Sequence, residues 1–531
     1  MNRLENQQAA EQIDRIYMDL EQLLMQNIMR HCKDYGQPIA TDEWLLKKLA
    51  EIGKLDKENI KIIARAAGLS RTAVERMLNE AAENALDQVE PALAYLTRRG
   101  LVGESVELPK SKRVKKVVKT LQDQAKDTTN LCNTTMLYKA RDAYKKFVTQ
   151  IASEASEIAE KQEFVDGLNK HASAVVVGAE SRQQAMRKCI KEFNEKGIPA
   201  FVDKKGREWT PEAYVNMAMR NTAKNVADEV QSARCQDYGV NLIEISSHFG
   251  ARPKCAKDQG KIYDLNNGSG YVEDAKGEKI RYYPWNSSSY GEPDGILGIN
   301  CTHHKFPFWP GMSLQTYFPA EDQEASDRLY KQTQVQRAME RDIRKQKRLC
   351  MLYDEAGDKD AFEKEAVKLK QKEAKLKNYI DKTPQLHRRK DREQVVGFDR
   401  SISAKAVAAN KVAKKKLEEK VRDDKIKADI KSIGIKGEID LHPKKMDVTE
   451  FSFDDVHINS ERDHKVTREE AECFIQEADI ALTRWNGRFV NYYGPNGAVY
   501  IDTQERNIRT AYHKEQYDEQ VKKMREVLEK R

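Results

Sequence analysis

A stretch in the middle of the chain differs in composition from everything around it. From residue 246 to residue 319, Gly, Pro, Asn, Ser and aromatic residues crowd together, as in NNGSGYVEDAKGEKIRYYPWNSSSYGEPDGILGINC. Gly and Pro at this density interrupt helices and specify turns with particular backbone conformations. We therefore expect an ordered, turn-rich module of mixed α/β structure at this place.

The segments before this module carry helical patterns. Thr210, Pro211 and Glu212 combine a capping residue, a first-turn proline and an acid that complements the helix dipole, so a helix is expected to begin there. Ser70 is expected to cap an earlier helix, RTAVERMLNEAAENAL. After this helical region, the run VNLIEI has the composition of a buried strand.

Length and composition limit the general class of protein. A chain of 531 residues exceeds what one core usually organises, and 39% hydrophobic against 34% charged residues indicates long solvated helices beside modest cores. No stretch approaches the roughly 20 apolar residues of a membrane helix, so we expect a soluble protein without membrane contact. Eight scattered cysteines are expected to be reduced thiols.

The formal charge of +8 is concentrated in one segment. Between Glu321 and Asp440 there are 32 Lys and Arg against 24 Asp and Glu, an excess of eight. We expect a charged helical arm here, broken at Pro384 and Gly397. A basic stretch can attract DNA by neutralising phosphates, whereas interspersed acids are more often a solvated helix face. Both interpretations stay open.

The last part of the chain is predicted to be a small α+β domain closed by a terminal helix. Thr467 and Glu470 form a T-x-x-E capping box, which specifies a helix. Three strand-like runs follow, RFVNYYG, AVYIDT and NIRTAYH, and the turn residues GPNG join the first two.

Together these patterns predict a mainly α, multidomain protein. The N-terminal region is expected to be helical, the centre mixed, the following arm helical and charged, and the end α+β. The expected boundaries are 1–125, 126–320 with the module at 246–319, 321–438, and 439–531.

Four residues of the module have the side chains that a tetrahedral zinc ion prefers. They are His248, Cys255, Cys301 and His303, although their spacing is not that of a standard zinc finger. A structural zinc would contribute folding free energy to a loop-rich module. A disulfide between Cys255 and Cys301 is one alternative, and a packed imidazole beside two buried thiols without a cross-link is another.

Two segments of the module, SSHFGARPKCAKDQGKIYDL and YGEPDGILGINCTHHKFPFWPGMS, carry a dense series of motifs in order. They resemble the signature of the phage minor capsid protein 2 family: a His, a G-A-R-P run, a Q-G pair, G-L-G-x-N-C-x-H and F-P-F-x-P-G. The likeness continues upstream in NTTMLYKARDAY and MAMRNTAKNVADEVQSAR and covers roughly residues 1 to 350. The matching motif positions include Arg252, Pro253, Gln259, Gly260, Asn300, Pro310 and Gly311.

The resemblance implies a structural protein of a tailed bacteriophage, made in the host cytoplasm and built into the virion head. It also implies a few copies near the portal, contacts with portal and capsid proteins, and a role in head morphogenesis or DNA packaging and delivery. From the residues alone, no nucleophile with a base and an orienting group can be assembled in this region, which fits a structural part. Arg252 before Pro253 is expected to anchor a loop to a carboxylate; contact with a neighbouring subunit or DNA is the alternative.

The terminal domain has the residue types of metal-independent RNA cleavage. That reaction needs a base for the 2′-hydroxyl proton, an acid for the 5′-oxygen and a cation for the charged phosphorane. The layout of residues 455 to 531 resembles the nuclease domains of the barnase, EndoU, colicin and RelE superfamily (BECR fold) found at the ends of phage head proteins. The candidates are His457, Arg462, His464, Arg484, Arg488, Arg509 and Thr510.

The pair His457 and His464 is the sharpest candidate, because a histidine can act as acid or base near neutral pH. The alternative is that both are exposed loop residues and that Arg484 and Arg488 flank a hairpin for solubility. Two hypotheses for the whole chain follow: a capsid protein armed with a ribonuclease that takes an RNA substrate, and a nucleic-acid-binding virion protein that acts in DNA packaging or delivery without catalysis.

Overall fold

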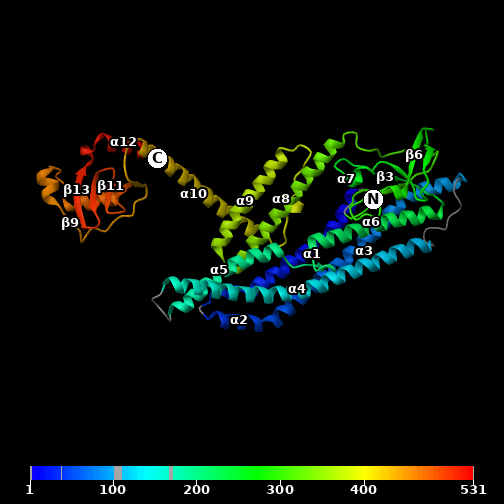
Figure 1. The fold of residues 1–531 in the computed structure, drawn as a ribbon, viewed down its shortest axis with the longest axis horizontal. Helices are drawn as coiled ribbons and strands as arrows, with labels where there is room; N and C mark the ends of the chain where they lie inside the picture. The colour runs from blue at the N-terminus through cyan, green and yellow to red at the C-terminus, as the bar shows by residue number, and fades with distance from the viewer. Residues whose placement is uncertain (1–2, 38, 101–110, 167–171, 300, 530–531) are drawn as a thin grey trace. The chain divides into compact units, whose positions relative to one another are not determined.

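The computed structural model describes residues 3–37, 39–100, 111–166, 172–299 and 301–529 (Figure 1). The described chain divides into two compact units, Met1–Asn410 and Lys411–Arg531. Helices predominate in the first unit and a sheet in the second, so the prediction of a mainly α, multidomain protein is confirmed. The expected boundaries at 125, 320 and 438 do not coincide with this division. Among the described helices, none is both long and apolar enough to cross a membrane.

Long helices that share one core build the N-terminal unit. They are α1 (Arg3–His31), α2 (Thr41–Ala50), α3 (Ile52–Arg98), α4 (Lys112–Asp166), α5 (Ala172–Lys196), α6 (Pro211–Asp237), α8 (Gln323–Ala356) and α9 (Lys359–Asp381). Helix α1 packs against α3, α6 and α8, and α4 packs against α3, α5 and α6. Because α8 and α9 place Ile343, Leu352 and Leu369 in this core, much of the expected arm is part of the N-terminal unit.

Local signals in the sequence specify some helix ends and not others. Helix α6 begins at Pro211 as predicted, and the Thr210 hydroxyl accepts a hydrogen bond from the Ala213 N–H at 3.3 Å. The predicted start at Ser70 is wrong, because α3 runs through it and the Ser70 hydroxyl donates to the Ala67 carbonyl inside the helix. Gly68, two residues earlier, does not end the helix either. A glycine within a helix costs only about 1 kcal/mol, and the burial of apolar side chains such as Met77 outweighs that cost.

The turn-rich module forms a small sheet as predicted. Its described strands run in the order β5-β6-β4-β3-β7, with β4 and β6 parallel and the other neighbours antiparallel. The elements are β3 (Leu242–Ile245), α7 (Pro253–Ala256), β4 (Ile262–Asp264), β5 (Gly270–Glu273), β6 (Lys279–Pro284), η3 (Trp285–Ser287) and β7 (Lys305–Pro307). The buried apolar cluster consists of Ile243, Ile245, Cys255, Tyr263 and Ile296. Such a core is small for the length of loop that it must hold.

The C-terminal unit is a sheet with helices on both faces. The described strands run in the order β8-β10-β11-β12-β13-β9, and only β13 and β9 of this order pair in parallel. The strands are β8 (Glu438–Asp440), β9 (Ser452–Phe453), β10 (Ile480–Arg484), β11 (Phe489–Tyr493), β12 (Gly497–Asp502) and β13 (Asn507–His513). The three predicted strand runs and the Gly494 to Gly497 turn are confirmed, whereas β8, β9 and β10 lay outside the prediction.

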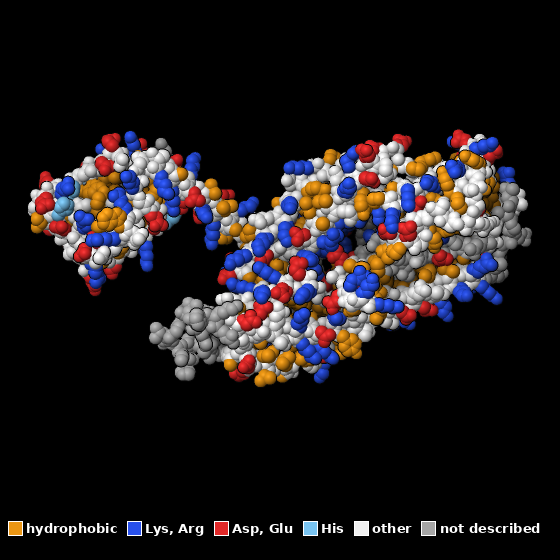
Figure 2. Space-filling view, in the orientation of Figure 1, with side chains coloured by type: hydrophobic (Ala, Val, Ile, Leu, Met, Phe, Trp, Pro, Cys, Tyr) orange, Lys and Arg blue, Asp and Glu red, His pale blue; other side chains and the backbone are white. Residues whose placement is uncertain are grey.

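Each face of this sheet has its own apolar cluster. Helix α11 (Arg468–Glu477) covers one face with Phe474 and Ile475, and the predicted capping box of Thr467 and Glu470 is formed at its start. The opposite face is covered by α12 (Glu519–Glu529) and by the last turns of α10 (Arg400–Ser432), a helix that spans the division between the units. The space-filling view shows Lys and Arg interspersed with Asp and Glu over the face of each unit that it presents (Figure 2).

A fully buried guanidinium ties α5 to the turn that follows α1. Arg182 is 0% exposed, and it donates hydrogen bonds to the carbonyl oxygens of Tyr35, Gln37 and Ile39 and to the Thr41 hydroxyl. The planar fork of arginine makes these bonds in several directions at once, which a lysine ammonium cannot reproduce. Arg182 therefore fixes the entry into α2.

We expect Arg182→Lys to destabilise the N-terminal unit by about 2–4 kcal/mol, because it leaves buried carbonyl groups without donors. The midpoint of thermal unfolding, followed by circular dichroism, should fall clearly below that of the unsubstituted protein. The matched control is Arg71→Lys, the same exchange at an exposed position of α3. Equal midpoints for the two variants would contradict the anchoring role.

Candidate functional site

A cavity of about 630 Å³ opens on the sheet of the C-terminal unit. The structure brings six of the sequence-predicted residues together in its lining: His457, Arg462, His464, Arg484, Arg509 and Thr510. The seventh, Arg488, does not line it, because its guanidinium is paired with Asp502 at 3.0 Å. These six residues lie on three segments of the chain, 457–464, 484 and 509–510, which only the fold brings together.

The face of the sheet explains which residues reach the cavity. Asn491, Tyr500 and Thr510 are paired across β11, β12 and β13 and therefore project from the same face. Helix α12 and the end of α10 cover only part of this face. The cavity lies over the part that they leave uncovered. Arg509 is the extra residue where the register between β12 and β13 shifts, and such a bulge re-aims a side chain.

Burial and the neighbouring cations favour the neutral form of His464. Its backbone N–H donates to the Ile458 carbonyl at 3.0 Å, which fixes the loop, and its Nδ1 lies 3.1 Å from the Gln516 Oε1. Because an amide oxygen only accepts, Nδ1 carries the proton and the Nε2 lone pair is left for substrate. Burial lowers the pKa of His464, and the positive Arg462 and His457 lower it further against the opposing hydrogen bond with Gln516.

His457 lies on a short helical turn, η5 (Val456–Glu461), beside His464 in the cavity wall. Its Nδ1 is 2.9 Å from a carboxylate oxygen of Glu461, one turn further along. A carboxylate accepts the Nδ1 proton and fixes the orientation of the ring, which is the arrangement that many catalytic histidines have. The two histidines therefore have different partners, an amide for His464 and a carboxylate for His457.

Aromatic side chains and arginines alternate around the rest of the cavity. The Arg509 guanidinium lies 5.4 Å from the centre of the Phe489 ring, and the Trp485 ring meets Phe489 edge to face at 5.5 Å. Trp485 is 76% exposed at the rim. Exposed aromatic faces beside cations are suited to bases and phosphates of single-stranded nucleic acid.

Sequence reasoning missed a chain of three tyrosines behind the histidines. The hydroxyls of Tyr493, Tyr500 and Tyr512 follow one another at 2.9 and 2.7 Å, and the ring of Tyr512 packs on His464 at 5.4 Å. Burial raises the pKa of Tyr500 and of Tyr512, so both stay protonated. Side chains alternate between the two faces of a strand, and this alternation places the three tyrosines on the same face of the sheet as Asn491. That pattern is the signal by which the sequence could have identified them.

The signature residues of the turn-rich module serve as loop anchors. The Arg252 guanidinium donates to the carbonyls of Ile299 at 3.0 Å and Gly295 at 3.2 Å, so it holds a loop as expected, but through carbonyl groups and not a carboxylate. Pro253 opens α7. The predicted Asn300 lies outside the described residues.

Gly260 and the Pro310–Gly311 turn are also structural. Gly260 has a φ of +67°, and a Cβ there would lie 2.3 Å from the backbone of Phe318, so no other residue fits without a shift. Gly311 has a φ of +73°, and its N–H donates to the Glu273 carbonyl at 2.6 Å. Pro310 precedes it in the exposed turn that follows β7.

Three of the four predicted metal ligands meet in this module. The Cys255 and Cys301 Sγ atoms lie 3.8 Å apart, and the His303 Nδ1 lies 3.3 Å from the Cys301 Sγ. His248 stacks its ring on His303, with 4.5 Å between centroids, but its own ring nitrogens lie near the Thr302 hydroxyl and the Phe249 carbonyl. The structure thus brings Cys255, Cys301 and His303 together and leaves His248 beside them.

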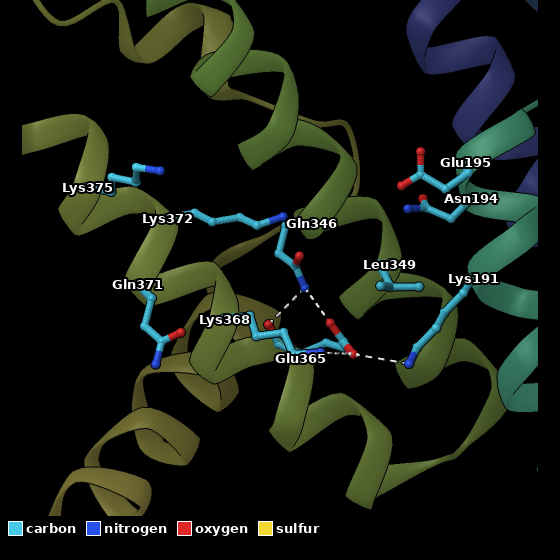
Figure 3. Close-up of a pocket in the computed structure, with 10 residues that line it drawn as sticks. All are labelled: Lys191, Asn194, Glu195, Gln346, Leu349, Glu365, Lys368, Gln371, Lys372 and Lys375. Carbon is cyan, nitrogen blue, oxygen red and sulfur yellow. Dashed lines mark hydrogen bonds and ion pairs between the residues drawn. The ribbon is translucent and has the colours of Figure 1, made fainter. Parts of the chain in front are cut away.

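Another cavity, of about 540 Å³, lies among α5, α8 and α9 and is rich in lysine (Figure 3). Its centre is Glu365, which accepts hydrogen bonds from Gln346 and Lys368 and pairs with Lys191. Although burial alone would raise the pKa of Glu365, these contacts keep it below its usual value. Lys191 of α5 and Gln346 of α8 thus join their helices to the buried carboxylate on α9, and Lys368 of α9 helps to balance its charge.

A helical body that carries a sheet module held by loop anchors has the make-up of a structural protein. The chain belongs to the phage minor capsid protein 2 family, whose model matches residues 3–381. A structural protein of Lactococcus phage LL-H is 26% identical over 358 residues, which are 66% of this chain and 88% of the relative. A structural protein of Lactococcus phage mv4 is 30% identical over 106 residues, 20% of this chain and 85% of the relative. No solved structure matches.

We expect His464 to titrate below the ordinary histidine pKa of about 6.5, because burial and two cationic neighbours disfavour its charged form. Arg462→Gln removes one of these cations and should raise the pKa of His464, and the change should be small because Arg462 is exposed and screened. NMR titration of histidine-labelled protein measures the shift. Arg506→Gln, an exposed arginine paired with Glu450 away from the cavity, should leave it unchanged.

Proposed function

We propose that this protein is a structural component of the phage head, located near the portal, whose C-terminal unit is a metal-independent ribonuclease. The structural part of the proposal is supported by the family match and by relatives that are themselves named structural proteins. That match ends at residue 381, before the C-terminal unit begins. The nuclease part therefore rests on the chemistry of the cavity alone.

One observation carries the nuclease proposal. Six residues chosen for RNA cleavage chemistry, on three separate segments of the chain, line a single cavity. Packing alone does not require two histidines and three arginines to face the same space. Like charges gathered around an open cavity disfavour one another, and an anionic ligand such as a phosphodiester relieves that cost.

In the proposed mechanism, each of these residues has one role in the reaction. Nε2 of His464 takes the proton of the ribose 2′-hydroxyl, and the 2′-oxygen forms a bond to phosphorus. The bond from phosphorus to the 5′-oxygen breaks while protonated His457 gives its Nε2 proton to that oxygen. The products are a 2′,3′-cyclic phosphate and a 5′-hydroxyl end, and Arg484 and Arg509 stabilise the negative phosphorane between them.

We expect the full chain to cleave mixed tRNA and mRNA in the presence of EDTA. His464→Ala and His457→Ala should each lower the rate by about 10²–10⁴-fold, the usual contribution of a general acid or base. His442→Ala is the matched control, since His442 is an exposed histidine of the same unit outside the cavity and paired with Asp423. Gel analysis of end-labelled RNA measures the rates.

The need for a 2′-hydroxyl separates this mechanism from cleavage that does not use the ribose as the nucleophile, and the histidine variants separate it from a contaminating ribonuclease. A substrate with a single ribonucleotide within DNA should be cut only after that residue, and a 2′-O-methyl group there should block the cut. Binding of single-stranded RNA or DNA without cleavage would contradict the nuclease and favour the nucleic-acid-binding alternative. In that case the salt dependence of affinity reports how many phosphates are contacted.

Incorporation into the particle tests the structural part independently. We expect peptides from both units in purified virions by mass spectrometry, at a few copies per particle, and cross-links from the N-terminal unit to the portal. A phage that encodes residues 1–410 alone should still incorporate the shortened protein, because those residues form a compact unit of their own. Absence of the full-length protein from purified particles would contradict the assignment.

A further inference from the structure

We propose that the turn-rich module binds one zinc ion through Cys255 Sγ, Cys301 Sγ and His303 Nδ1. These three ligand atoms all lie within 4.8 Å of one another. A disulfide needs its sulfurs about 2.05 Å apart, whereas the two sulfurs here are 3.8 Å apart. With zinc–sulfur bonds of about 2.3 Å, two ligands of a tetrahedral ion are separated by about 3.8 Å. The observed spacing therefore fits a shared metal without a movement of either sulfur.

The hydrogen bonds around His303 settle which ring nitrogen faces the sulfurs with a lone pair. The backbone N–H of His248 donates to the Gln259 Oε1 at 3.1 Å, which identifies this atom of the amide as the oxygen. The same oxygen lies 2.9 Å from His303 Nε2, so that nitrogen must carry a proton. In the neutral imidazole Nδ1 then has the lone pair, and it lies 3.3 Å from Cys301 Sγ.

This arrangement is the one that holds metal-binding histidines in other proteins. A ligating imidazole usually donates its second N–H to a carbonyl or carboxylate, which fixes the tautomer and the ring orientation. Gln259 is 0% exposed, and its Oε1 contacts both the His248 N–H and the His303 Nε2. The N–H of Leu297 lies 3.2 Å from Cys301 Sγ, and the Arg252 guanidinium lies 3.6 Å from Cys255 Sγ. Both contacts favour sulfurs in the thiolate form.

The fourth position of the ion is open to water. Cys255, Cys301 and His303 line the wall of a cavity of about 1220 Å³ within the N-terminal unit. His248 lines the same cavity, but its Nε2 is 2.7 Å from the Thr302 hydroxyl. The sulfurs bind as thiolates, so binding releases to solvent the protons that the thiols carry.

The ion would fasten the long loop between η3 and β7 to the start of α7. Other contacts across the same junction are polar: Asp258 accepts from the Ser289 N–H at 2.9 Å, and Lys254 pairs with Glu292 and Asp294 at the surface. The apolar cluster below them is small. A metal cross-link supplies the folding free energy that such a core lacks.

The test uses the full chain, reduced and freed of metal by dialysis against a chelator. We expect one equivalent of zinc to bind in competition with a fluorescent chelator, and Co²⁺ to give the absorption of a tetrahedral thiolate site. The double exchange Cys255→Ser with Cys301→Ser should abolish both signals. Cys473→Ser, which removes an exposed cysteine of the other unit, should keep them. His248→Ala should keep them as well.

A subtler variant guards against simple misfolding. Gln259→Leu removes the partner of His303 without touching a ligand and should weaken zinc binding by about 10–100-fold, with an unchanged circular dichroism spectrum. Failure of the reduced protein to take up zinc would overturn the proposal and leave thiols that hydrogen-bond to imidazole. A disulfide in freshly purified protein, seen by mass without reductant, would overturn it as well. Loss of binding in His248→Ala would overturn the three-ligand assignment.

Discussion

The N-terminal unit depends on one buried carboxylate. Glu21 on α1 is almost fully buried, and its two oxygens accept hydrogen bonds from the Ile198 N–H at 3.1 Å and from Arg348 on α8 at 2.5 Å. A charge out of contact with water is tolerated only with such partners, because leaving it unpaired costs several kcal/mol. The contact joins segments separated by 177 and 327 positions, so it forms only when the fold is complete. Gly197 is required beside it, since a Cβ there would lie 2.1 Å from the Glu21 Oε1.

Around this contact, the helices and the sheet module divide the tasks of the N-terminal unit. The helices bury continuous apolar stripes and give a rigid body. The module has little apolar interior, and its order comes from anchors such as Arg252, Asp258 and Gln259, whose partners are loop atoms. The loop surface is thus held in shape by polar bonds, which is suited to a surface that must keep one conformation for assembly.

The sequence predicted elements where a local rule is strong. The start of α6 at Pro211, the capping box at Thr467 and the hairpin at Gly494 each depend on a few neighbouring residues. It failed at Ser70, where the cap residue is also compatible with a helix interior and only long-range packing decides. Strand β10 was missed because its run IALTR is short and follows a helix directly.

The same distinction applies to the two candidate sites. Residue types alone identified the histidines and arginines of the C-terminal cavity, since a reaction mechanism limits which side chains are useful. Asn491, Tyr500 and Gln516 were missed, because their relevance depends on strand register and on a loop contact. For the metal site, side-chain chemistry predicted four ligands. Only the structure shows that His303 faces a cysteine sulfur whereas His248 faces the Thr302 hydroxyl.

The composition of the second apolar cluster of the C-terminal unit limits where a recombination joint could connect this unit to a new upstream sequence. Ile426 and Ile430 of α10 belong to the same apolar cluster as Ile480, Tyr493 and Met524. A recombination joint placed at the first strand, near residue 438, would leave that cluster without its helix and expose apolar surface. A unit transferred with its apolar cluster intact would therefore begin inside α10, where a continuous helix accepts a new upstream sequence without a change of backbone.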